Sequence, residues 1–442
     1  MQLLTSNARI DGLPLFRATH HEGRLKRKIF VNFHLQEVWG GQPKYVDMLS
    51  RALIDAGIPA FCVVGRPMPE WGDTPYPVIP VNAVPNRREY PYDILPKEIL
   101  WEHADFCANG ALSRIIDSIA ALGKGIDTVV LHGHHLDGAL VAAHVERLMR
   151  LRVPMKIEIL ATVHSLGLEK VHGIEPLMNG ARETNELRRR LDLEALAYGR
   201  AAHSGGVIVG TPYAQSLVAR QLAIPLEKVR ICRPGIDHSL FNACKPERER
   251  QRFLARLGIS ADAQIVLSSG RMDPVKNHET VVDAFAEISD AFPRAHLVVM
   301  GGFAGREDEA YRQSLRQRAA RLGIAAQTTV CQGVSHDALP EVYRSSDVFV
   351  VAEWYGPWNM MVAEALACST PVVGSRNSGA IKDAERRGAV IAVRPDDVSE
   401  IASNVQRLLS SADLRESLKC RALDYAKHLS WKAAAHITAG LD

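Results

Sequence analysis

Short apolar runs alternate with longer amphipathic segments twice along this chain, and this alternation limits its fold more than any other feature. The first half has apolar runs at residues 28–33, 60–65, 127–133, 156–163 and 205–210. The second half repeats the rhythm at residues 264–270, 295–302, 328–333, 346–352 and 370–375. Runs rich in Val and Ile between segments of helical period are typical of βαβ units. The sequence therefore predicts an α/β fold with two parallel sheets.

The two halves are expected to be separate domains. At 442 residues the chain is longer than one hydrophobic core usually serves. Pro234, Gly235 and Pro246 interrupt the pattern between the halves, which places the boundary near residue 245. Two doubly wound domains in tandem leave a cleft at the carboxyl ends of their strands, where open α/β sheets bind ligands.

Composition excludes several classes of protein. Hydrophobic residues make up 47% and charged residues 23% of the chain, as in ordinary soluble globular proteins. The 53 basic and 50 acidic residues are too balanced for a nucleic-acid-binding surface. The seven cysteines lack the spacing of a zinc site and read as reduced thiols. No apolar stretch is long enough for a membrane span or a signal peptide, so we expect a cytoplasmic protein without integral membrane association.

Two cations in the second half are candidates for binding a diphosphate. In "SSGRMDPVKN" a predicted strand ends at Ser269, the following loop carries Arg271 and Lys276, and a helix begins near Asn277. Side-chain charge and a helix N-terminus act together on an anion. The alternative is a solvated loop with an asparagine cap.

A carboxylate lies within an apolar helix further along. Glu364 interrupts "MMVAEALAC", which follows a loop with Gly356, Pro357 and Asn359. A buried carboxylate costs several kcal/mol unless it is hydrogen-bonded. The hydroxyl groups of a ribose could supply those bonds; alternatively, Glu364 caps its own helix.

Both motifs carry a resemblance to a known family. The pairing of "GRMDPVKN" with "MMVAEALACSTPVVGSRNSGAIKD" resembles the retaining glycosyltransferases of family 4, which have the GT-B fold. Segments of the first half are similar to sucrose-phosphate synthases, at residues 40–53, 92–112, 131–143, 162–171 and 233–241. The resemblance implies two Rossmann-like domains facing a cleft. Residues 1–245 would bind the acceptor and residues 246–425 the nucleotide sugar, and residues 426–442 would cross back to the first domain.

The resemblance also assigns residues to the two substrates. On the donor side it places Gly40, Gly41 and Glu364, with Asn359, Met360, Met361 and Glu353 as further candidates. On the acceptor side it places Gln42, Lys97, His134, Asp137, Lys170 and Arg190, of which Lys97, Lys170 and Arg190 would hold a phosphate. His164, at the end of a predicted strand, would face the transferred sugar.

The implied chemistry is transfer of a hexosyl group, with glucose favoured, from a UDP-, ADP- or GDP-sugar to a phosphorylated sugar. Such enzymes are thought to use no protein nucleophile, so Arg271 and Lys276 would stabilise the leaving diphosphate. No cofactor or metal is expected, and no D-x-D motif that could hold a metal ion follows a predicted strand. Two alternatives stay open. The acceptor could be an inositol phosphate, an aminocyclitol or another sugar, or the protein could bind nucleotide sugars without catalysis.

One position departs from the family pattern. Members of the family usually carry two glutamates separated by seven residues (E-x7-E). With Glu364 as the second glutamate, Gly356 stands at the position of the first. Glu353 could reach the site in its place, or Asn359 and the amides of Met360 and Met361 could bind a different sugar. A third explanation is an impaired catalyst. Because the cations and Glu364 are present, altered donor or acceptor choice is favoured.

Overall fold

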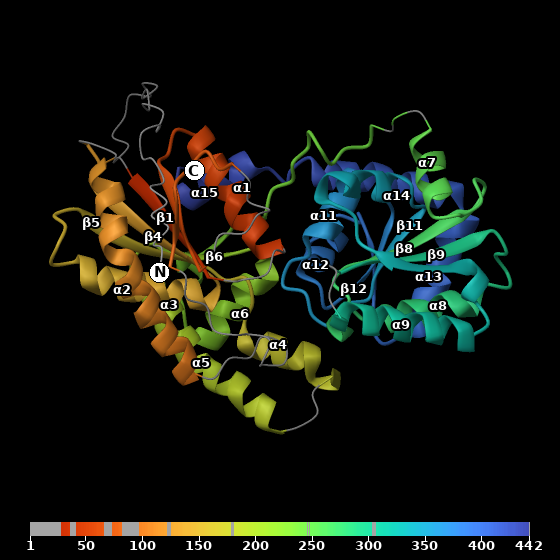
Figure 1. Cartoon of the computed structure of the whole chain (residues 1–442), viewed down its shortest axis with the longest axis horizontal. Helices are drawn as coiled ribbons and strands as arrows, with labels where there is room; N and C mark the ends of the chain where they lie inside the picture. The colour runs from red at the N-terminus through yellow and green to blue at the C-terminus, as the bar shows by residue number, and fades with distance from the viewer. Residues whose placement is uncertain are drawn as a thin grey trace, which may run out of the picture.

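The computed structural model has two domains, each built around one parallel sheet (Figure 1). The residues that the structure describes are 28–35, 41–65, 73–81, 97–121, 125–177, 181–244, 246, 248–302 and 306–441. Among them, no helix is both long and apolar enough to cross a membrane. The predicted α/β class with two Rossmann-like domains is confirmed.

The sheet of the first domain has the order β3-β2-β1-β4-β5-β6-β7. Its strands are β1 (Lys28–His34), β2 (Ala60–Val64), β3 (Val78–Pro80), β4 (Thr128–His134), β5 (Lys156–Thr162), β6 (Gly206–Val209) and β7 (Val229–Ile231). The helices are α1 (Gly41–Asp55), α2 (Lys97–Ala121), α3 (His135–Met149), α4 (Gly167–Ile174), α5 (Ala181–Ala202) and α6 (Pro212–Leu222). One core lies between the sheet and α2, α3 and α5, and α1 packs on the opposite face.

The sheet of the second domain has the order β10-β9-β8-β11-β12-β13. Its strands are β8 (Gln264–Ser269), β9 (Ala295–Gly301), β10 (Thr328–Gln332), β11 (Val348–Val351), β12 (Val372–Ser375) and β13 (Ile391–Val393). The helices are α7 (Glu249–Arg256), α8 (His278–Ile288), α9 (Arg306–Arg321), α10 (Leu339–Arg344), α11 (Met360–Ala367), α12 (Gly379–Glu385), α13 (Val398–Ser410) and α14 (Ala412–Ala426). Helices cover both faces, and each face has its own core.

All the strands predicted from apolar runs are present, with ends that move by at most two residues. Strands β3, β7 and β13 were not predicted. Each has only three residues, which is too short for a periodic pattern. All three lie at sheet edges.

The last helix, α15 (Trp431–Ala439), lies on the first domain beside α1 (Figure 1). The Trp431 ring meets the ring of Tyr45 edge to face, at 5.4 Å between centroids. A Cβ atom on Gly235 would lie 2.2 Å from the backbone nitrogen of Trp431, so only glycine permits this approach. The chain therefore crosses between the domains a second time before its end.

The strand order reverses between β1 and β4 in the first sheet and between β8 and β11 in the second. Open parallel sheets bind ligands outside such reversal points, at the carboxyl ends of the strands. The loops that follow β8 and β11 carry Lys276 and Glu353, and β4 ends at His134. The topology thus places several predicted site residues where a ligand is expected.

Candidate active site

The loop after β8 directs Lys276 inward. Asp273 caps the short 3-10 helix η6 (Pro274–Lys276) by accepting a 2.9 Å hydrogen bond from the Val275 amide. Asn277 has a left-handed backbone, with φ of 55°, and its side-chain amide donates to the carbonyls of Ala352 and Pro395 at 3.0 and 2.7 Å. These bonds fix the loop against the end of β11. The Lys276 side chain is 19% exposed.

Lys276 meets a fully buried carboxylate. Its Nζ lies 2.5 Å from Oε2 of Glu353, whose side chain is 0% exposed. The other oxygen, Oε1, accepts a 3.1 Å hydrogen bond from the amide of Asn359. Asn359 in turn accepts from the Met361 amide at 3.0 Å and caps α11. One carboxylate therefore connects the cationic loop after β8 with the first turn of α11.

Gly356 leaves the space that this carboxylate occupies. A Cβ atom at position 356 would lie 2.1 Å from Oε1 of Glu353, well inside contact distance. The Glu353 carboxylate therefore fills the space beside residue 356. The choice among the three explanations for the missing glutamate stays a prediction. Asn359 contributes its side chain to the same cluster, together with the α11 N-terminus.

Arg271 is arranged differently from Lys276. Its side chain is 60% exposed, and its Nε lies 3.2 Å from Oδ2 of Asp273. The two predicted cations therefore have different carboxylate partners. Their assignment to a diphosphate stays a prediction, with Lys276 the more enclosed of the two.

Glu364 is bound by a lysine from the other domain. Lys44, on α1, places its Nζ 2.5 Å from Oε1 of Glu364 and also contacts Nε2 of His336. Tyr343 donates its hydroxyl to Oε2 at 3.5 Å. Burial raises the pKa of Glu364, but Lys44 and His336 outweigh it and hold the pKa below its usual value. Because Asn359 caps α11, Glu364 does not cap its own helix.

Lys44 was not among the residues predicted from sequence. It lies in segment 40–53, which resembles sucrose-phosphate synthases, but nothing in that segment shows that a partner 320 residues away would bind it. Gly41 gives a second contact across the same boundary, because a Cβ atom there would lie 3.6 Å from Cγ of Met360. The start of α1 and the start of α11 are therefore neighbours.

A cluster of buried rings lines the first domain at the ends of β4 and β5. Nδ1 of His134 lies 3.3 Å from Nε2 of His164, and the Tyr45 ring packs edge-on against His164 with centroids 4.9 Å apart. His132 shares a 2.8 Å hydrogen bond with the Thr162 hydroxyl. Burial lowers the pKa of His164 to about 3 and the pKa values of His132 and His134 well below their usual range. These rings are neutral at pH 7, and they hydrogen-bond as neutral donors and acceptors.

The buried histidines predict that stability falls in mild acid. A histidine with a depressed folded pKa stabilises the protein above its unfolded pKa of about 6.5, and this contribution is lost as pH falls below that value. Between pH 7 and pH 5.5, each buried histidine with a lowered pKa should reduce the free energy of unfolding by about 1 kcal/mol. These histidines are His132, His134, His164 and His278. Burial raises the pKa of Glu169 to about 7, so this residue acts in the opposite direction and offsets about the loss from one histidine.

Urea unfolding at pH 7 and 5.5 measures this loss, which we expect to be about 3 kcal/mol. The variant His164→Asn should show a smaller loss than the wild type, since one depressed histidine is gone. Equal stability at the two pH values would contradict neutral buried rings.

The predicted acceptor cations are only partly described. Arg190 is buried, and its Nε donates to Oε1 of Glu194 at 2.8 Å, while NH2 donates to the Ser165 hydroxyl at 3.3 Å. Lys170 lies on α4, partly buried. Lys97 begins α2, but its side chain lies outside the described part of the structure, as does Gly40. Arg190 is therefore half of a buried ion pair rather than an isolated cation, and its assignment to the acceptor phosphate stays a prediction.

Three further acceptor candidates lie near the same end of the sheet. Asp137, on α3, has its Oδ1 3.5 Å from Nδ1 of His135. His134 is 1% exposed and lies within hydrogen-bond distance of His164. Nε2 of Gln42 is buried and has no hydrogen-bond partner within the described ranges. All these assignments stay predictions.

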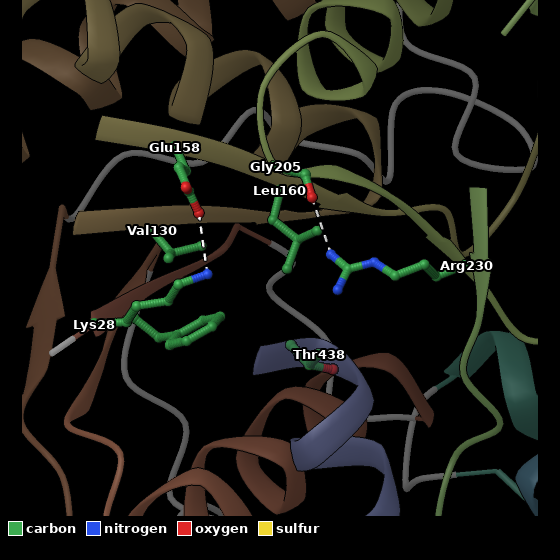
Figure 2. A pocket seen from close by; sticks show the side chains of 8 residues that line it. Lys28, Val130, Glu158, Leu160, Gly205, Arg230 and Thr438 are labelled. Carbon is green, nitrogen blue, oxygen red and sulfur yellow. Dashed lines mark hydrogen bonds and ion pairs between the residues drawn. The ribbon is translucent and has the colours of Figure 1, made fainter. Parts of the chain in front are cut away.

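A small cavity lies elsewhere, on the face of the first sheet that α15 covers (Figure 2). Its lining includes Lys28, Glu158, Arg230 and Thr438, and its volume is about 60 Å³. Ligand pockets typically measure about 300 to 1,000 Å³. Lys28 pairs with Glu158 at 3.2 Å, and Arg230 donates to the carbonyl of Gly205 at 3.0 Å. This cavity is too small for a nucleotide sugar and lies at the opposite end of the strands from His134.

Family models match both halves of the chain. Residues 39–240 match the model described as Glycosyltransferase Family 4, and residues 249–424 match the model described as Glycosyl transferases group 1. The chain belongs to the glycosyltransferases. Its resemblance to family 4 enzymes with the GT-B fold is therefore confirmed, and it is a nucleotide-sugar-dependent glycosyltransferase. The two matched ranges meet near the predicted domain boundary.

Relatives of this glycosyltransferase include enzymes named for phosphorylated products or acceptors. Mannosylfructose-phosphate synthase of Agrobacterium fabrum is 26% identical, over 77% of this chain and 72% of the relative. D-inositol 3-phosphate glycosyltransferase 1 of Catenulispora acidiphila is 28% identical, over 74% and 75%. The fold matches sucrose-phosphate synthase from Thermosynechococcus elongatus, with a TM-score of 0.72, 24% identity, and coverage of 94% of this chain and 98% of that one.

A second solved structure contains a donor. Anabaena HepE in complex with UDP-glucose matches with a TM-score of 0.67 and 15% identity, over 93% of this chain and 98% of that one. At this identity the likeness concerns the fold. Together the comparisons confirm the sucrose-phosphate synthase-like resemblance seen in the sequence.

Proposed function

We propose that the protein is a retaining glycosyltransferase that moves a glucosyl group from a nucleoside diphosphate to a phosphorylated sugar, forming a disaccharide phosphate. The observation that carries the proposal is the meeting of α1 and α11. Lys44 from the acceptor-side domain binds Glu364 of the donor-side domain, and Gly41 lies against Met360. These contacts support a single site between the two reversal points, to which the proposal assigns Lys276 of one domain and His164 of the other.

Relatives and neighbours support the two substrates. The names of the relatives include a fructose-phosphate product and an inositol 3-phosphate. Both compounds carry a phosphate on a polyhydroxylated ring. Their shared chemistry therefore supports a phosphorylated acceptor. UDP-glucose in HepE supports a nucleoside diphosphate hexose as donor.

The proposed reaction retains the configuration of the transferred sugar. An acceptor hydroxyl attacks the anomeric carbon on the face from which the diphosphate leaves, the bond from that carbon to the diphosphate oxygen breaks, and this oxygen takes the hydroxyl proton. The chain contributes charge and alignment. Lys276 and Arg271 would stabilise the leaving diphosphate, and the α11 N-terminus would add its partial positive charge. No metal enters the proposal, so EDTA should leave turnover unchanged.

The acceptor is tested by mixing purified protein with UDP-, GDP- or ADP-glucose and candidate acceptors. We expect nucleoside diphosphate release to require fructose 6-phosphate, and the product to have an α linkage by NMR. Release that instead requires inositol 3-phosphate would favour the acceptor of the second relative. Nucleotide binding without turnover of any donor would overturn the proposal and favour a binding protein.

A further inference from the structure

We propose that Glu353 is a positioning residue of the donor site, which holds Lys276 and the first turn of α11 at one point. The inference rests on the proposed function, because that function assigns the diphosphate to Lys276 and α11. It changes the role expected of Glu353 from binding the transferred sugar to orienting the groups that bind the diphosphate.

Burial separates these two roles. The Glu353 side chain is 0% exposed, and both of its oxygens already have partners: Lys276 at 2.5 Å and Asn359 at 3.1 Å. A sugar hydroxyl can bind a carboxylate only where the carboxylate is accessible. Lys276 is 19% exposed and is therefore the member of this pair that a ligand can reach.

The geometry gives each partner a fixed direction. The Lys276 stem packs over Gly270, with Cδ and Cγ both 3.4 Å from the position of a Cβ atom there, and Glu353 holds the ammonium group at its far end. The Asn359 side chain is held at both ends, by Glu353 and by the Met361 amide. A charged group on a flexible four-carbon stem becomes preorganised only when both stem and head are held.

Position 356 completes the arrangement. The Glu353 carboxylate fits only because residue 356 has no Cβ, which would lie 2.1 Å from Oε1. A carboxylate at 353 and a side chain at 356 therefore exclude one another. Glycine at 356 thus leaves room for the buried carboxylate of a residue three positions earlier.

The first test is a double-mutant cycle of melting temperatures, which needs no ligand. Gly356→Ala should lower the melting temperature in the wild type and have little further effect in Glu353→Ala, because truncation of Glu353 removes the clash. Equal losses in the two backgrounds would overturn the geometry. Gly205→Ala, in the first domain, is a control for close packing: its Cβ would lie 2.7 Å from the Ile159 carbonyl oxygen, so the loss of melting temperature should be the same in both backgrounds.

The second test separates positioning from a purely structural role. Glu353→Gln keeps the shape and the contact with Asn359 but removes the charge that holds Lys276. Because a negative charge beside the diphosphate is lost, UDP should bind more tightly by calorimetry, while kcat for UDP-glucose falls about ten-fold or more. A merely structural pair would leave UDP affinity and kcat unchanged.

Comparing the affinities for UDP and UDP-glucose distinguishes a positioning role of Glu353 from direct binding of the sugar. Positioning predicts that Glu353→Gln changes the affinities for the two ligands by the same factor. A selective loss of UDP-glucose affinity would overturn positioning and assign Glu353 to the sugar. If the wild type binds none of UDP, GDP and ADP, the proposed function fails and the positioning role fails with it, whatever the double-mutant cycle shows.

Discussion

We expect Lys276→Ala to abolish sugar transfer and also to destabilise the fold. Removing one partner of a buried ion pair leaves the other charge without compensation, which costs about 3 to 5 kcal/mol. Glu353 is fully buried, so this cost applies to it in full. Loss of a group that stabilises a leaving group typically lowers kcat by about 100- to 1,000-fold. Urea unfolding measures the first effect, and nucleoside diphosphate release from UDP-glucose measures the second.

A second substitution separates the two effects. In Lys276→Ala with Glu353→Gln no buried charge is left, so stability should recover most of its loss while transfer stays abolished. Lys427→Met is a matched control, because Lys427 pairs with Asp424 on the surface, where both side chains are more than half exposed. Exposed pairs contribute about 0 to 1 kcal/mol. Near-normal transfer by Lys276→Ala would remove Lys276 from the mechanism.

The strands could be predicted from sequence because their signal is local. A run such as "QIVLSSG" is apolar and β-branched, and burial on both faces of a parallel sheet requires that composition. The loop after β8 was predicted for a similar reason, since a strand end, two cations and a helix start are adjacent in the chain. Strand β13, with three residues, carries too little pattern to be recognised.

The partners of the site residues could not be predicted in the same way. Lys276 meets Glu353 across 77 residues, and Lys44 meets Glu364 across 320. The first pair depends on β8 and β11 being neighbours in one sheet, and the second depends on how the two domains pack. No local pattern specifies either. The absence of a side chain at Gly356 was visible in the sequence. Its consequence, room for the Glu353 carboxylate, required coordinates.

We expect Lys44→Met to destabilise the protein and to increase the response of its melting temperature to nucleotide. Glu364 is 4% exposed at its side chain, and Lys44 is its main cationic partner, with His336 at 3.5 Å as the other. Loss of Lys44 should cost about 3 kcal/mol or more of unfolding free energy at pH 7. Because the low pKa of Glu364 depends on Lys44, this pair stabilises the wild type above pH about 4.5 and is lost as pH falls below it.

Nucleotide binding tests what the pair does in the site. If ribose hydroxyls bind Glu364, they compete with Lys44 in the wild type and find the carboxylate without that partner in Lys44→Met. UDP should therefore raise the melting temperature of Lys44→Met more than that of the wild type. A smaller rise would instead show that Lys44 itself binds the nucleotide. Lys419→Met, which breaks an exposed pair with Glu416, should leave both stability and the UDP response unchanged, because such a pair is screened by water.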